Sequence, residues 1–352
     1  MTANIRIPAV ALITMLAASV VQGGPRWDIS EDAYLQLSIL GQVHASFTEG
    51  ADDEHDLYLR RARVILAGQV TDGVKFFMET DNDNAGRSGT SGVSTDIQDA
   101  FVEQRLCENH FVQGGLILLP FSFENAASAA SLLGLDYNLE TLKFAETFAW
   151  RDYGVVFRGD FGKRVAYRIG AFDGYDDSAG TKNPDADVRI TGHIAVNLIG
   201  ETDNGWFFSQ NPLGDQPYLA IGAGIDSQDE ASLIESDEEG VPAAIIDSEA
   251  MVVDFQSGFA VGELFATVNG AWHTWDNAKF DGETAFVEAG LRCKHLQGVG
   301  KVSQQEPDAG DSVTDYTVGI YHFAKKHSAR AGLEYRWGDS SDQVLVGFQV
   351  AL

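Results

Sequence analysis

Along most of the chain, apolar and polar side chains alternate with a period of two residues, and helical periodicity is almost absent. In the last ten residues, apolar side chains recur at every second position from Val344 to Leu352. The positions between them hold Gln, Leu, Gly, Gln and Ala. Because successive side chains of a strand point to opposite faces, this alternation predicts strands with one apolar face and one mixed face. We therefore expect an all-β protein.

The N-terminus carries a short apolar segment. Residues 7–21 are apolar apart from Thr14 and Ser19, Arg6 precedes them, and Gly23 follows closely. A basic start, an apolar centre and a small-residue end are typical of a secretory signal peptide. A membrane-spanning helix is the alternative, but it needs about 20 residues. We expect residues 1–23 to be a signal peptide and residues 24–352 to form a single domain.

Alternating strands fit a soluble β-sandwich or an outer-membrane barrel. A sandwich keeps its polar face outside, whereas a barrel turns its apolar face to lipid and its polar face to a wet lumen. Short turns that alternate with longer polar connections, at 82–95, 174–186 and 226–248, favour the barrel. We predict a transmembrane antiparallel β-barrel, with both termini in the periplasm. The sixteen predicted strands are 33–47, 57–70, 73–81, 96–106, 110–118, 151–161, 164–173, 187–198, 216–225, 249–258, 260–272, 284–292, 296–305, 313–323, 327–337 and 343–352.

The chain is strongly acidic. It has 24 Lys and Arg against 52 Asp and Glu, which gives a net charge of −28. This balance argues against a nucleic-acid partner, because neutralising phosphates requires a basic surface. No Lys or Arg lies between Arg189 and Lys279, and residues 226–249 hold nine carboxylates. These carboxylates keep the surface solvated or bind divalent ions. Alternation nevertheless directs seven arginines towards the lumen: Arg61, Arg63, Arg105, Arg158, Arg168, Arg330 and Arg336.

Motifs for catalysis or metal binding are weak. Cys107 and Cys293 each have a histidine nearby, but the strand order places them in turns on opposite sides of the barrel, so neither a zinc site nor a disulfide is expected. The calcium-like run that starts at Asp81 lacks its closing glutamate. There is no HExxH or Gly-x-Ser-x-Gly motif. We expect no catalytic residue, no metal and no cofactor.

Four segments, in order, resemble the phosphate-selective porin O/P family: 59–63 (LRRAR), 116–124 (LILLPFSFE), 150–155 (WRDYGV) and 316–335. The resemblance implies a homotrimeric sixteen-stranded porin in outer-membrane lipid and lipopolysaccharide. It also implies a third extracellular loop, here 119–150, that folds into the pore. Its charged residues Glu124, Lys143 and Glu146 would then lie at the constriction. The chain departs from the family in its acidic composition, which argues against strong phosphate selectivity, and in ending on Leu352 instead of an aromatic residue.

Three functions are compatible with these features. The first is an outer-membrane porin, not an enzyme, through which small hydrophilic solutes or ions, phosphate or other anions among them, diffuse passively. The second is a secreted, soluble β-fold enzyme or lectin. The third is a structural or adhesive outer-membrane barrel without an open pore.

Overall fold

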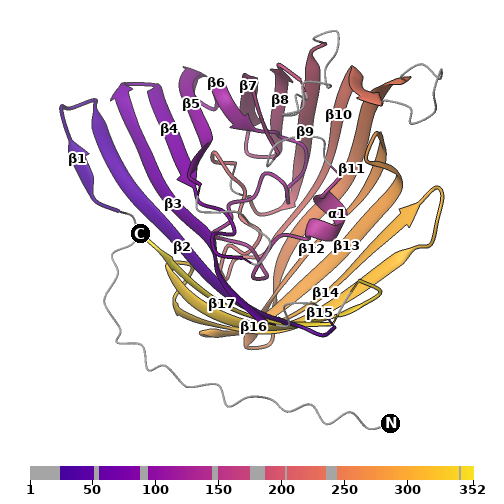
Figure 1. The fold of residues 1–352 in the computed structure, drawn as a ribbon. Coiled ribbons are helices and arrows are strands. Elements are labelled where there is room, and N and C mark those ends of the chain that lie inside the picture. The colour runs from indigo at the N-terminus through magenta and orange to yellow at the C-terminus, as the bar shows by residue number, and fades with distance from the viewer. Residues whose placement is uncertain are drawn as a thin grey trace, which may run out of the picture.

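Sixteen antiparallel strands, β2 to β17, form a closed barrel in the computed structural model, because β17 pairs with β2 (Figure 1). The predicted barrel and its strand number are confirmed. The structure describes residues 24–50, 55–87, 94–144, 150–174, 187–202, 204–234, 244–340 and 342–352, so the expected signal peptide lies outside the described residues. The strands are β2 (Tyr34–Thr48), β3 (His55–Thr71), β4 (Val74–Asp81), β5 (Asp96–Cys107), β6 (His110–Leu118), β7 (Arg151–Phe161), β8 (Val165–Phe172), β9 (Arg189–Ile199), β10 (Tyr218–Ile234), β11 (Ala244–Val261), β12 (Leu264–Asn277), β13 (Phe280–Cys293), β14 (Leu296–Pro307), β15 (Val313–Lys325), β16 (Ala329–Gly338) and β17 (Gln343–Ala351).

The largest difference from the predicted strands lies in the acidic region. A loop was expected over 226–248, but β10 continues to Ile234 and β11 begins at Ala244, and the two strands pair over this extension. The extension of β10 carries polar or charged side chains at successive positions from Asp226 to Glu230, so apolar and polar residues do not alternate there. The sequence therefore carried no signal for this extension.

The two faces of the barrel have opposite character. On β7, Val155 and Phe157 are 44% and 49% exposed on the outer face, whereas Val156 and Arg158 are buried on the inner face. The same inversion holds around the ring, with large apolar side chains outside and Arg, Asp, Glu, Gln and His inside. Such a surface suits a lipid environment and does not fit a soluble β-fold. Within the described ranges, no helix is both long and apolar enough to cross a membrane.

A short additional strand, β1 (Arg26–Asp28), pairs with residues 34–36 of β2. The last pair of β17 on that strand is Ala351 with Leu40. β1 therefore binds the part of β2 that extends past the C-terminus, which continues main-chain pairing at the closure. This strand was not among those predicted from the sequence.

The connections differ between the two ends of the barrel. At the end where β2 begins and β17 ends, here called the turn end, six connections contain two or three residues. The seventh, between β9 and β10, runs over residues 200–217. At the opposite end, the loop end, β6 and β7 are joined by residues 119–150, which include the single turn of helix α1 (Leu139–Leu142). Figure 1 shows α1 within the ring of strands.

The strand order yields a prediction about the cysteines. Cys107 and Cys293 are exposed and free, in the β5–β6 and β13–β14 turns. Eight strands separate these turns, far more than a disulfide can bridge. Maleimide should add two labels to the folded protein without prior reduction, as counted by intact mass. An intramolecular Cys107–Cys293 disulfide found in digested peptides would contradict the strand order.

Candidate functional site

A β-bulge in β3 turns two consecutive arginines into the lumen. Gln42 of β2 pairs with Arg61 and Val43 pairs with Leu59, so Arg60 is the extra residue. Both guanidinium groups are buried inside, while Leu59 stays on the outer face. Strict alternation predicted Arg61 and missed Arg60, because a bulge locally breaks the two-residue period.

Asp136 of the 119–150 connection binds both of these arginines. Arg60 Nε donates to its Oδ2 at 2.5 Å, and Arg61 Nη2 donates to its Oδ1 at 2.9 Å. Burial opposes ionisation of Asp136, but Arg60 and then Arg61 outweigh it and hold the pKa of this carboxyl well below its usual range. Lys301 of β14 donates to the Asp136 carbonyl oxygen. The connection is thus bound from two parts of the wall, β3 and β14, which are five strands apart in the ring.

Three further predicted arginines face the lumen, each beside a carboxylate. Arg63 donates to Glu79 at 2.6 Å and to Asp81 at 2.8 Å. Arg158 donates to Glu103 at 2.7 Å, and Arg336 donates to Glu334 at 2.6 Å. The wall is therefore charged but locally compensated.

The other three predicted arginines differ from these. Arg330 and Arg168 are buried in the lumen and donate to main-chain oxygens of the two connections that fold into the barrel, 119–150 and 200–217, here called the inner connections. Arg330 donates to Leu132 at 2.7 Å, and Arg168 donates to Trp206 at 2.9 Å. Arg105 does not join the group. Its side chain is 43% exposed at the turn end, where it pairs with Asp72.

Sequence reasoning missed two other buried arginines. Arg151 donates to Asp99 at 2.9 Å, and Arg189 donates to Asp226 at 2.7 Å. Both are the first residues of their strands, β7 and β9. Near a strand end the alternation contains too few positions to fix the direction of a side chain. Their acidic partners lie two strands away on β5 and on the neighbouring strand β10, so they would have been a signal only once the register was known.

Apolar side chains of the 119–150 connection pack on apolar patches of the inner wall. Leu133 and Leu135 pack with Val299, Tyr321 and Leu345 of β14, β15 and β17. The main-chain N–H of Leu135 donates to Glu334 at 2.8 Å. These contacts place the predicted apolar stretch 126–135 against the wall inside the barrel.

Charged residues of this connection have different positions. Glu124 is buried and accepts hydrogen bonds from Asn138 Nδ2 at 3.0 Å. Burial, and then the neighbouring Glu288, raise the pKa of Glu124 to about 7, against the opposing effect of Lys301. Lys143 is exposed, with Nζ 5.3 Å from the centre of the Phe144 ring. Glu146 lies outside the described residues.

The shared arginine contact predicts the effect of Asp136→Asn. The substitution leaves two buried guanidinium groups without their common carboxylate, so we expect a loss of about 3–5 kcal/mol in the free energy of unfolding. Urea unfolding in detergent, followed by tryptophan fluorescence, measures it. Asp72→Asn is the matched control, since it removes only the exposed partner of Arg105 and should cost about 0–1 kcal/mol. Equal losses would contradict an anchoring role.

Glu124 predicts a pH effect on ion selectivity. With a pKa near 7, this carboxyl gains a proton as the pH falls from 8 to 6, and the lumen loses a negative charge. Reversal potentials in a salt gradient should therefore move towards anions at the lower pH. Glu124→Gln should reduce this pH response. An unchanged pH response in that variant would assign the titration to another group.

Among the described residues, no group of three or more His, Cys, Asp or Glu side chains is placed to hold a metal ion. The charged inner wall and the two inner connections are thus the features from which a function can be argued.

Comparison with known proteins supports a porin. The family model of phosphate-selective porin O and P matches residues 36–196, which confirms the resemblance over that part of the chain. No curated protein matches the chain significantly.

Solved structures share the fold at low identity. The loop L8 deletion mutant of OmpT, an outer membrane protein of Vibrio cholerae, is 13% identical, with a TM-score of 0.60 over 92% of this chain and 100% of that one. Salmonella typhi OmpF in complex with daunomycin is 13% identical, with a TM-score of 0.63 over 91% and 98%. The anion-selective porin from Comamonas acidovorans is 12% identical, with a TM-score of 0.61 over 91% and 100%. The chain thus has the fold of outer-membrane porins, and over residues 36–196 it matches the family model of phosphate-selective porin O and P.

Proposed function

We propose that the protein is a passive channel through which small hydrophilic solutes and ions, phosphate or other anions among them, cross the outer membrane. The observation that carries this proposal is the inverted barrel, apolar outside and charged inside. A charged lumen is of use only if water and polar solutes reach it. Residues 1–23 would direct export and then be removed.

The outer face would contact lipid and lipopolysaccharide, and the protein would assemble as a homotrimer. The apolar side chains around the barrel support the lipid contact. OmpT of Vibrio cholerae, similar in fold at 12% identity, is described in a trimer form. Assembly in the present chain is proposed on that likeness and on the family match.

The 119–150 connection would constrict the channel. It is bound by Arg60 and Arg61 on one wall and by Lys301 on another, so it crosses the lumen. Solutes would pass the charged side chains that surround it.

Selectivity would depend on the lumen more than on the net charge. Charges inside a narrow pore act at short range, whereas carboxylates outside it are screened beyond about 8 Å at physiological ionic strength. Because most lumen arginines have a carboxylate beside them, we infer weak anion selectivity or nearly none.

Reversal potentials in planar bilayers test this proposal. Replacing Arg61 and Arg63 by Ala should shift the reversal potential towards cations, because Glu79 and Asp81 then lose Arg63, and Asp136 keeps only Arg60. Neutralising Asp237, Glu238 and Glu239 should shift it little, and less at high salt. A larger shift from the acidic variant would overturn the inference. A wild-type barrel that never conducts would overturn the channel itself.

A second candidate is a structural or adhesive barrel with a closed lumen. The observation in its favour is that residues 200–217 also enter the barrel, where Arg168 binds them.

A further inference from the structure

The connection between β9 and β10 is unusually long for the turn end and crosses the lumen. On one side, Arg158 donates to the Asn204 carbonyl oxygen at 2.9 Å, and Arg168 donates to that of Gly205 at 2.8 Å. On the other side, Asn211 donates to Gln297 of β14 at 2.8 Å. β8 and β14 are six strands apart in the ring, so the segment spans the barrel.

Aromatic side chains of this segment pack on an apolar patch of the inner wall, which is here called the seat. Trp206 packs against Phe77 of β4 and Phe101 of β5, with ring centres 5.2 and 5.7 Å apart, and Phe207 lies 5.3 Å from Phe77. The same cluster contains Ile117, Leu119, Val156 and Phe172. Apolar groups are unfavourable on the wall of a watery channel, so this patch is suited to being covered.

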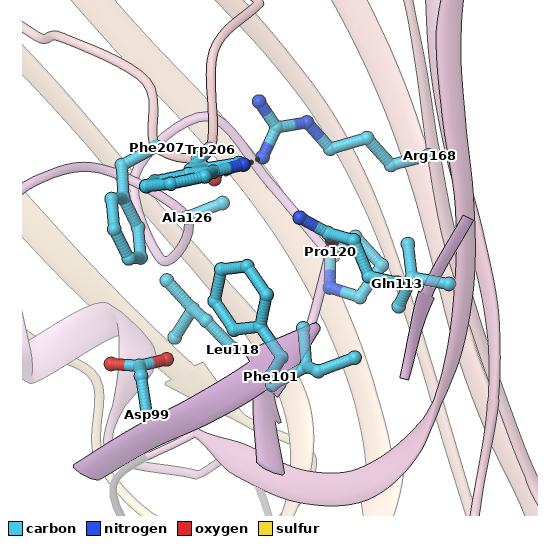
Figure 2. A pocket seen from close by; sticks show the side chains of 11 residues that line it. Asp99, Phe101, Gln113, Leu118, Pro120, Ala126, Arg168, Trp206 and Phe207 are labelled. Carbon is cyan, nitrogen blue, oxygen red and sulfur yellow. Dashed lines mark hydrogen bonds between the residues drawn. The ribbon is translucent and has the colours of Figure 1, made fainter. Parts of the chain in front are cut away.

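The segment also binds the 119–150 connection. Phe208 N–H donates to Ala126 O, and Ser128 N–H donates to Phe208 O, both at 2.9 Å. The cavity left between the two connections and the wall, lined by Phe101, Arg168 and Trp206 among others (Figure 2), holds about 10 Å³, the room of one water. The two connections together close this side of the lumen.

The bonds to the two connections differ in kind. Asp136 presents a carboxylate to Arg60 and Arg61, whereas residues 204–206 present neutral oxygens to Arg168. Asn204 Oδ1 accepts from both Nε and Nη2 of Arg168 at 3.2 Å, the position that one oxygen of an anionic group would occupy. A guanidinium binds an anionic oxygen more strongly than a neutral one, so an anion can compete for Arg168.

We propose that residues 200–217 are a displaceable plug, and that their seat on β4, β5, β7 and β8 binds a solute that joins an aromatic ring to an anionic group. The plug itself combines the two groups. The Trp206 ring packs in the apolar seat, and the Trp206 carbonyl oxygen accepts a hydrogen bond from Arg168 (Figure 2). The inference rests on the proposed channel and names a class of solute for it.

Single-channel recording with three probes tests the inference. Benzoate carries the ring and the anion, acetate only the anion, and benzyl alcohol only the ring. Benzoate should raise the open probability of the wild-type barrel more than either of the others. Arg168→Ala should weaken the benzoate effect about tenfold, the loss expected for one charge-assisted hydrogen bond. Arg105→Ala is the matched control and should leave the effect unchanged, because Arg105 lies at the rim.

Two further variants address the plug directly. Asn204→Asp gives Arg168 a carboxylate and should lower both the open probability and the response to benzoate. Replacing residues 202–214 by a short Gly-Ser turn should raise the conductance permanently and remove the response. Heat-modifiable migration in gels verifies that each variant is folded.

The outcomes separate this inference from the proposed function. If wild-type channels conduct but respond alike to all three probes, or if the shortened variant has wild-type conductance, the inference is overturned and the channel remains. If no folded variant conducts, the proposed channel fails.

Discussion

Main-chain groups in lipid have no water to bind, and this constraint decides the architecture. Each strand must pair on both edges, so the sheet has to close. Closure here depends on β17 meeting β2 over Gln343 to Ala351, with β1 pairing the remaining part of β2. Once the sheet is closed, the side chains of successive residues point alternately to the lipid and to the lumen. The charged interior follows from closure, because no other place in the membrane admits these side chains.

The interior has its own balance of positive and negative side chains, which the net charge of −28 for the whole chain does not describe. Buried arginines and carboxylates lie in contact, as Arg63 does with Glu79 and Asp81. A buried charge without a partner is costly, so each inward arginine needs an acceptor. Some acceptors come from neighbouring strands, and others come from the connections that fold inwards. The second arrangement makes the position of a connection depend on the charges of the wall.

Much of this fold could be predicted from the sequence, because side chains alternate with a fixed period of two and lipid requires the sheet to close. All sixteen strands overlap their expected ranges, although β10 runs nine residues further, and Arg61, Arg158 and Arg168 face inwards as expected. Three features could not be predicted from the sequence, for physical reasons. Arg60 depends on a bulge, the extended β10–β11 hairpin lies where polarity no longer reports direction, and the path of residues 200–217 is fixed by contacts with distant strands. Tertiary contacts of that kind leave no periodic trace in a sequence.

The bulge at Arg60 has a consequence for how such a wall can change. Adding one residue to a strand would normally exchange its two faces from that point onwards. Here the extra residue is absorbed locally, and Leu59 and Val64 both remain on the lipid side. A barrel can therefore acquire an inward charge by insertion as well as by substitution, with strand number, register and outer surface all preserved. An insertion inside a strand would normally disrupt the fold. When a bulge absorbs it, the insertion changes only the side chains that face the interior of the channel.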